Sequence, residues 1–129
     1  MQREIKFRAW DNFFKQMYYF DFENNIEVRS GHLWIVHEEG AVSSKSPSIK
    51  IMQYTGLKDR NDKEIYEGDL VAVADYASWE GLYKVIWDEE NSMYMIEDAY
   101  GDREKLCEFE EYLKKGNIYE NPELLERCI

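Results

Sequence analysis

The first stretch of the chain alternates between hydrophobic and polar positions. Ile5, Phe7 and Ala9 alternate with charged residues, which is the period of two expected of a strand with one buried face. Lys6 and Arg8 fall on the opposite, solvent-facing side of this pattern. The pattern therefore predicts a half-buried strand in this part of the chain.

Further runs of β-forming residues follow at 17–20, 26–28, 33–36, 49–54, 70–74, 82–87 and 93–96. The last three are joined by short turns, as in a meander that forms the core of a small barrel. The continuously apolar run at 70–74 is typical of a strand buried on both faces. The predicted fold is therefore mainly β, or α+β, with a small SH3-like barrel of about five strands and N-terminal strand additions.

Two stretches near the end change to helical spacing. Leu106, Phe109 and Leu113 fit one face of a helix, and Gly116 is a typical residue to end it. Residues 121–125 then form the pattern of a cap, a first-turn proline and acid, and two leucines. These patterns predict one helix before Gly116 and a short C-terminal helical segment after it.

Residues 37–48 lose all periodicity. They contain Gly40, Pro47 and four serines, with only two apolar residues among them. Such a composition predicts a mobile loop rather than a linker between domains. The segment before it is too short and too poor in apolar residues to fold alone, so residues 1–129 are predicted to form a single domain.

The composition indicates a folded and acidic protein. Of the 129 residues, 44% are hydrophobic and 16% aromatic, and the aromatic content argues against disorder. The formal net charge is -11, but residues 1–60 hold nine basic and eight acidic side chains, whereas residues 61–129 hold seven and nineteen. An acidic second half repels phosphate backbones and speeds association with cationic partners. It equally serves as a solvated face that keeps the protein soluble.

The chain carries no sign of membrane insertion or secretion. No run approaches the ~20 apolar residues of a membrane span, and the first residues lack the apolar core of a signal peptide. The two cysteines, Cys107 and Cys128, are too few for a disulfide framework. We therefore expect a cytoplasmic protein with reduced thiols and no membrane partner.

Residues that could carry catalysis or bind a metal are sparse. Neither His32 nor His37 is close in sequence to a cysteine, so no metal site and no cofactor is predicted. Glu67 and Asp69 bracket Gly68 and form the best carboxylate pair for a hydrolase. The same three residues also fit a turn that leads into a strand.

An N-terminal strip mixes cationic and aromatic side chains. Its members are Arg3, Lys6, Arg8, Lys15, Trp10, Phe13 and Phe14. Such mixtures bind single-stranded nucleic acid through phosphate attraction and base stacking. Strand alternation already explains Lys6 and Arg8 without a ligand, so nucleic-acid binding is the weaker explanation of this strip.

Three segments, at 3–11, 53–69 and 116–125, carry a family resemblance. They contain REIKFRAWD, then QYTGLKD followed by EIYEGD, and finally GNIYENPELL. In this order they resemble the YopX family, small proteins of bacteriophages, prophages and their bacterial hosts. The resemblance implies a phage-related cytoplasmic protein with a mostly β fold, and it brings no catalytic residues.

The resemblance assigns no role to the individual motif positions. They are Arg8, Trp10, Asp11, Tyr54, Thr55, Gly56, Leu57, Asp59, Tyr66, Glu67, Gly68, Asp69, Gly116, Asn117, Asn121 and Pro122. The glycines allow backbone conformations that other residues resist, so the second motif can serve folding. A loop made rigid in this way could also present Lys58, Asp59 and Arg60 to a partner.

Three functions are compatible with these observations. The first is a non-catalytic accessory protein of phage or prophage origin, an interaction module for a host or phage protein. The second is a nucleic-acid-related accessory protein, which either contacts single strands or mimics DNA with its acidic face. The third is a hydrolase that uses Glu67 or Asp69. Exposed strand edges and many tyrosines would also permit a homo-oligomer.

Overall fold

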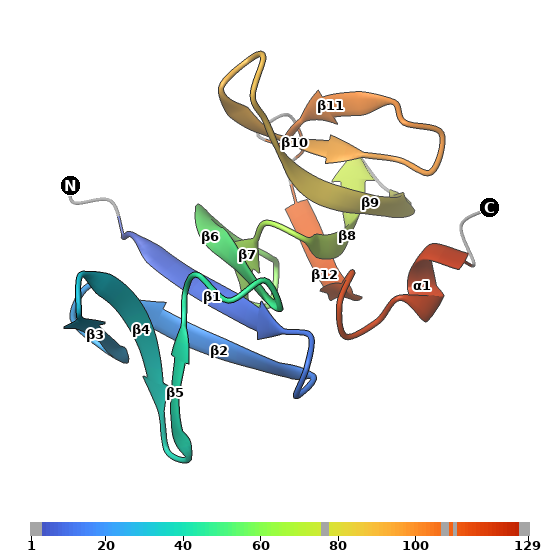
Figure 1. Ribbon diagram of the computed structural model, residues 1–129. Coiled ribbons are helices and arrows are strands. Elements are labelled where there is room, and N and C mark those ends of the chain that lie inside the picture. Colours follow the sequence, from blue (N-terminus) through green and yellow to red (C-terminus); the bar gives the residue numbers. More distant parts are fainter. Residues whose placement is uncertain (1–3, 76–77, 107–108, 110, 127–129) are drawn as a thin grey trace. The chain divides into compact units, whose positions relative to one another are not determined.

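The computed structural model describes residues 4–75, 78–106, 109 and 111–126 (Figure 1). Contacts within the chain divide it into two compact units, unit 1 (Met1–Tyr54) and unit 2 (Thr55–Ile129). Both consist mainly of antiparallel strands, which confirms the predicted mainly β fold. The single domain expected for residues 1–129 stays a prediction.

Unit 1 holds two antiparallel sheets. In the first, β1 (Lys6–Asp11) lies between β2 (Gln16–Asp21) and the beginning of β6 (Ile49–Lys58). The second has the order β3 (Ile26–Arg29), β4 (His32–His37) and β5 (Gly40–Ser43). Strand β6 continues past Tyr54 into unit 2, where it pairs with β7 (Glu64–Tyr66).

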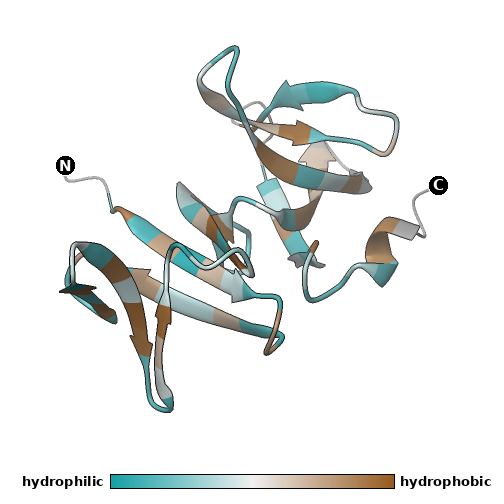
Figure 2. Cartoon of the chain, in the orientation of Figure 1, coloured by the Kyte–Doolittle hydropathy of each residue, from teal (hydrophilic) through white to brown (hydrophobic). Residues whose placement is uncertain are grey.

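Apolar side chains of the two sheets form the core of unit 1. Ala9, Ile35 and Ile49 are buried, and Tyr18 and Val42 are among the side chains that pack against them. Hydrophobic residues accordingly follow one another along β4 and β5 (Figure 2). The alternating pattern of the N-terminal strand therefore places Ala9 correctly in the core.

Arg8 departs from the predicted pattern. It is fully buried although alternation places it on the solvent-facing side, and Trp10 and Asp11 are buried as well. Arg8 and Trp10 lie on one face of β1 and Ala9 and Asp11 on the other, and all four are buried, so both faces are covered and a period of two no longer marks an exposed side. The prediction of an exposed Arg8 is therefore wrong. Lys6 is half-buried, with its Nζ atom 2.8 Å from a carboxylate oxygen of Glu4.

Unit 2 is built on a five-stranded antiparallel sheet. Its order is β11 (Arg103–Lys105), β10 (Met93–Glu97), β9 (Ser78–Asp88), β8 (Asp69–Asp75) and β12 (Glu111–Asn117). Strands β8, β9 and β10 form the expected meander, and the apolar run at 70–73 is buried throughout. Ile65, Val85 and Ile96 belong to the core. The SH3-like barrel stays a prediction, since β11 and β12 are the two ends of this strand order.

The helix predicted before Gly116 is wrong where the structure describes it, because residues 111–117 form β12; residues 107, 108 and 110 of the predicted helix lie outside the described residues. In its pairing with β8, Tyr112 lies opposite Val73, and the register shifts just before Gly116. Apolar residues three and four apart fit a helix but also a strand with neighbours on both faces, and the pairing decides the outcome. The short C-terminal helical segment is confirmed as α1 (Glu123–Glu126). In the described part of the chain, no helix has the length and apolar character needed to cross a membrane.

Part of the loop predicted at 37–48 is a strand. Strand β5 pairs with β4 so that Val42 lies opposite Ile35. With only 4 residues, β5 is too short to show a period, and its pairing partner rather than its own pattern makes it a strand. The loop prediction is therefore wrong at Gly40–Ser43, while the mobility of the segment stays a prediction.

Candidate functional site

A recurring local structure among the described residues is a turn held by an aspartate. In each case the carboxylate accepts hydrogen bonds from backbone amides two to four residues later in the chain. The aspartates are Asp11, Asp21, Asp59, Asp88 and Asp98. Part of the acidic character noted in the sequence is therefore used to hold turns and does not form a solvated face.

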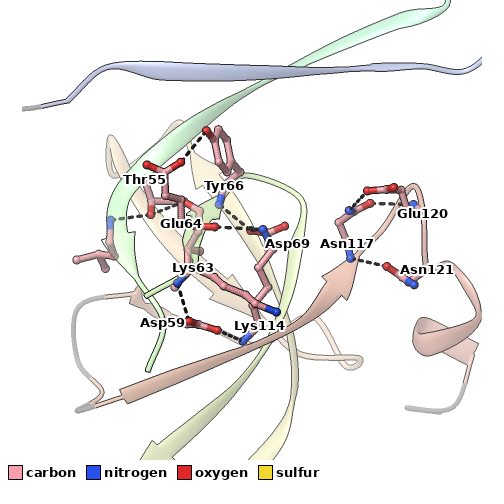
Figure 3. A network of polar contacts seen from close by, with 12 residues as sticks. Thr55, Asp59, Lys63, Glu64, Tyr66, Asp69, Lys114, Asn117, Glu120 and Asn121 are labelled. Carbon is pink, nitrogen blue, oxygen red and sulfur yellow. Dashed lines mark hydrogen bonds and ion pairs between the residues drawn. The ribbon is translucent and has the colours of Figure 1, made fainter. Parts of the chain in front are cut away.

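Asp59 is the most connected of these aspartates and belongs to the second motif. Its Oδ1 accepts hydrogen bonds from the amides of Asn61 (2.8 Å) and Lys63 (2.9 Å), and its Oδ2 accepts one from the amide of Lys114 (3.0 Å; Figure 3). The carboxylate thus closes its own loop and ties that loop to β12. Burial raises the pKa of Asp59, but the three amides and the charge of Lys63 outweigh this effect and lower the pKa overall.

Asp69, at the start of β8, forms the second centre of the network in unit 2. It is fully buried, and its Oδ2 accepts a hydrogen bond of 2.7 Å from the amide of Tyr66. The Nζ atom of Lys114 lies 3.2 Å from the same oxygen and donates to the carbonyl oxygen of Glu64 at 3.1 Å (Figure 3). A carboxylate held in this way has no access to a substrate in solvent, which disfavours the hydrolase that pairs Asp69 with Glu67.

Lys114 is the residue that the sequence did not single out. It lies in the segment predicted as a helix, where its neighbours across the sheet could not be known. Only the pairing of β12 with β8, which places Lys114 opposite Val71, brings its ammonium group to Asp69. Nothing in the sequence around it distinguishes Lys114 from its neighbour Lys115.

The Thr-Gly-Leu part of the second motif has a structural explanation too. The hydroxyl of Thr55 donates to the carbonyl oxygen of Ile65 at 2.7 Å and accepts a hydrogen bond from the amide of Leu57 at 3.2 Å. Between them Gly56 has φ +91°, a conformation that side chains rarely adopt. The Thr55 hydroxyl therefore links β6 to β7 within unit 2, in addition to the pairing of the two strands.

The third motif begins at the end of β12 and is built around Asn117. The side-chain oxygen of Asn117 accepts hydrogen bonds from the backbone amides of Tyr119 (3.0 Å) and Glu120 (2.8 Å). The backbone amide of Asn117 donates to the Oδ1 atom of Asn121 at 3.2 Å. Gly116 is required beside it, because a Cβ atom at this position would collide with the Asn121 side chain. Because Gly116 has no side chain, the Asn121 side chain can lie against it and accept the hydrogen bond from the backbone amide of Asn117. Asn121 directly precedes Pro122.

The second and third motifs meet at Gly68. Its carbonyl oxygen accepts a hydrogen bond of 2.9 Å from the amide of Ile118, and its own amide donates to the carbonyl oxygen of Val85 at 2.8 Å. The structure therefore brings together two segments that lie far apart in the sequence. The first motif stands in unit 1, where Arg8, Trp10 and Asp11 are all buried in β1.

The loop of the second motif also presents basic side chains. Lys58 and Arg60 are exposed on either side of the buried Asp59, and the backbone amide of Arg60 donates to the carbonyl oxygen of Tyr112 at 2.9 Å. A cavity of about 380 Å³ lies beside them in unit 2, with Phe109 among its lining residues. Hydrogen bonds hold the loop in one conformation, but the Asp59 carboxylate already accepts three hydrogen bonds from backbone amides of the chain.

Reactive groups do not converge in this network. Its carboxylates accept hydrogen bonds from backbone amides, from the Tyr66 hydroxyl and from the Asn117 side-chain amide, and one pairs with the Lys114 ammonium group, an arrangement that stabilises turns. Over the residues that the structure describes, no group of three or more His, Cys, Asp or Glu side chains could hold a metal ion.

These features define a class of protein: small, mainly β, with sequence motifs whose side chains hold turns and join strands. The chain belongs to the YopX protein family, whose model matches residues 6–126. This confirms the resemblance drawn from the three segments. No curated protein matches the chain.

Two solved structures are similar to the chain over nearly all of its length. The crystal structure of protein EF1440 from Enterococcus faecalis has 29% sequence identity and a TM-score of 0.64, with 96% of this chain and 99% of that chain covered. The crystal structure of protein yopX from Bacillus subtilis has 23% identity and a TM-score of 0.59, with 92% and 96% covered. The second likeness supports the fold alone.

Proposed function

We propose that this chain is a non-catalytic accessory protein that acts by binding another protein through unit 1. The observation that carries the proposal is the turn between β1 and β2, where Phe13 and Phe14 are 76% and 65% exposed. Because the two rings are adjacent and in contact, they form a contiguous apolar patch, which marks an interface better than a single exposed ring does. Hydrophobic residues stand out at the tip of this turn in Figure 2.

The aromatic turn is held in shape before any partner arrives. The carboxylate of Asp11 accepts hydrogen bonds from the amides of Phe13 (2.9 Å) and Phe14 (3.2 Å), and Lys15 donates to the side chain of Asn12 at 2.8 Å. The two rings lie edge to face with their centroids 4.8 Å apart. Anchors that are already ordered lose little entropy on binding, which favours affinity.

Charge supports a protein partner over nucleic acid. Unit 1 carries seven basic and seven acidic side chains, whereas unit 2 carries nine and twenty. An acidic unit repels phosphates, and of the N-terminal strip considered for single-strand binding, Arg8 and Trp10 are buried, while Arg3 lies outside the described residues. The acidic DNA mimic also loses support, because several aspartates bind backbone amides.

The family resemblance supplies the setting of the proposal. It supports a phage or prophage origin, the bacterial cytoplasm as the compartment, and a partner from the phage or its host. The meander of unit 2 supports a small SH3-like barrel as the finer description of its fold. A homo-oligomer remains a competing use of the same aromatic turn.

A capture experiment from host lysate tests the proposal. We expect a specific protein to be retained by the wild type and by Tyr100→Ala, an exposed aromatic of unit 2, but to be lost with the double variant Phe13→Ala, Phe14→Ala. Binding is then measured with the purified partner. Equal retention by all three proteins, or no specific partner, would contradict the proposal. Sedimentation of the wild type that shows self-association abolished by the double variant would assign the turn to a homo-oligomer instead.

A further inference from the structure

Unit 1 contains a cavity of about 350 Å³ next to the aromatic turn. Phe14, Tyr18, His37 and Glu39 are among its lining residues, and the floor includes Val42. All of these residues belong to unit 1, where the ends of β2, β4 and β5 come together. The cavity therefore combines aromatic rings, an apolar floor and one carboxylate.

The walls of this cavity are well fixed. The rings of Tyr18 and His37 are stacked, with centroids 4.6 Å apart and planes inclined by 21°. The hydroxyl of Tyr18 donates to Gln16 at 2.9 Å, and both Tyr18 and Val42 pack against the core of unit 1. Phe14 is positioned by the Asp11 turn. A ligand would meet these groups without a large rearrangement.

The electrostatic environment of the cavity is negative. Glu39 is the one acidic residue among those that line it, and the lining includes neither lysine nor arginine. Burial, followed by the charges of Asp11 and Glu39, raises the pKa of the Tyr18 phenol. The ammonium group of Lys15, in the neighbouring turn, is bound to the side chain of Asn12. A cationic group is therefore the favoured occupant.

We propose that this cavity binds an arginine side chain of the protein partner. A guanidinium group is flat, so it can lie against the rings of Phe14 and Tyr18 while it donates two hydrogen bonds to the Glu39 carboxylate. A phosphate or carboxylate would be repelled by Glu39, and a purely apolar group would remove that carboxylate from water without compensation. The inference rests on the proposed protein-binding function and names the chemistry that the partner supplies.

The experiment uses small probes and so does not depend on finding the partner. Acetyl-Gly-Arg-Gly-amide is titrated into the isotopically labelled protein, and the backbone amide signals are followed by NMR. We expect saturable shifts at residues 14–18 and 37–42, with weak affinity, on the order of millimolar. The citrulline peptide, which is neutral but nearly isosteric, should bind at least about five-fold more weakly, because it lacks the charge that pairs with Glu39.

The chain offers a matched control for each side chain that matters. Glu39→Gln should weaken binding of the arginine peptide about ten-fold, whereas Glu38→Gln, in the same turn but outside the cavity, should leave it unchanged. Phe14→Ala should weaken it several-fold, whereas Phe22→Ala, which removes an exposed ring of unit 1 that does not line the cavity, should not.

Three results would overturn the inference. They are equal binding of the arginine and citrulline peptides, equal losses in Glu39→Gln and Glu38→Gln, and no shifts in the cavity up to about 50 mM peptide. The proposed function would survive each of them, because a partner could still bind the aromatic turn. Conversely, arginine binding in a protein that captures no partner would leave the cavity assignment intact and contradict the proposed function alone.

Discussion

Unit 1 and unit 2 are both small antiparallel β units that bury polar residues, but the feature that distinguishes each is different: a buried polar network in unit 2 and an exposed aromatic turn in unit 1. Unit 2 turns polar groups inward, where Asp59, Asp69 and Lys114 hold its loops and strands together. Unit 1 leaves Phe13 and Phe14 outside, on a turn that is already ordered. If the proposed interface at the aromatic turn is correct, recognisable motifs and binding surfaces do not coincide in this protein. Most motif positions of unit 2 serve the fold, while the candidate interface lies beside the first motif rather than within it.

The comparison is tested most strongly at the buried ion pair of unit 2. Lys114→Met leaves the carboxylate of Asp69 buried without the ammonium group at 3.2 Å, and Asp69 is 0% exposed. We expect the free energy of unfolding to fall by about 3–5 kcal/mol, measured by urea denaturation. Lys115→Met, at the exposed neighbouring position of β12, is the control and should change it by less than about 0.5 kcal/mol. A loss of similar size in both variants would refute a structural role specific to Lys114.

The next test concerns the close approach of Gly116 to Asn121. Gly116→Ala places a Cβ atom against the Asn121 side chain, which must shift and weaken its bond to the amide of Asn117. We expect a destabilisation of about 2 kcal/mol, since overpacking and a lost cap combine. Gly101 has φ +87° with nothing near its position, so Gly101→Ala reports backbone strain alone, about 1 kcal/mol. If both variants are equally destabilised in thermal unfolding, the contact with Asn121 contributes nothing.

A smaller effect is expected from the titration of Asp59. Its pKa is lowered in the folded protein, so the stability that it contributes is present above the unfolded value of about 3.9 and is lost as the pH falls through the folded value. The pKa values of Asp21 and Asp88 are lowered as well, by hydrogen bonds from their own turns, and act with the same sign. Acid unfolding should therefore set in below about pH 5.

Asp59→Asn isolates this contribution. The variant should be less stable at pH 7, by about 1–2 kcal/mol, and should lose less stability than the wild type between about pH 5 and pH 2. Asp62→Asn, in the same loop at an exposed position with φ +65°, is the control and should keep the steep acid dependence. Identical pH profiles of wild type and Asp59→Asn would show that the carboxylate charge is not linked to folding.

Local pattern and family resemblance predicted the features of this molecule that depend on residues close together in the sequence. Alternation located the strand with Ala9, and runs of β-forming residues joined by short turns located the meander and the mainly β class, because these signals depend on the neighbours of each residue along the chain. They misplaced Arg8, β12 and β5, because those depend on which strand lies alongside. For the same reason Lys114 could not be assigned. Asp59 and Asp69 were found through the motif, but their partners in β12 were not.

The last prediction asks whether the exposed aromatic residues of unit 1 are needed for folding at all. Phe13→Ala and Phe14→Ala should each change the free energy of unfolding by no more than about 0.5 kcal/mol, because the side chains are 76% and 65% exposed. Phe20→Ala is the contrast: its ring stacks on Phe7 at 5.5 Å and packs against the core, so a loss of about 3 kcal/mol is expected. Urea denaturation of the three variants shows which of these aromatic side chains stabilise the fold and which do not. If Phe13 and Phe14 prove as costly as Phe20, the turn serves folding like the motifs of unit 2, and the contrast between the units disappears.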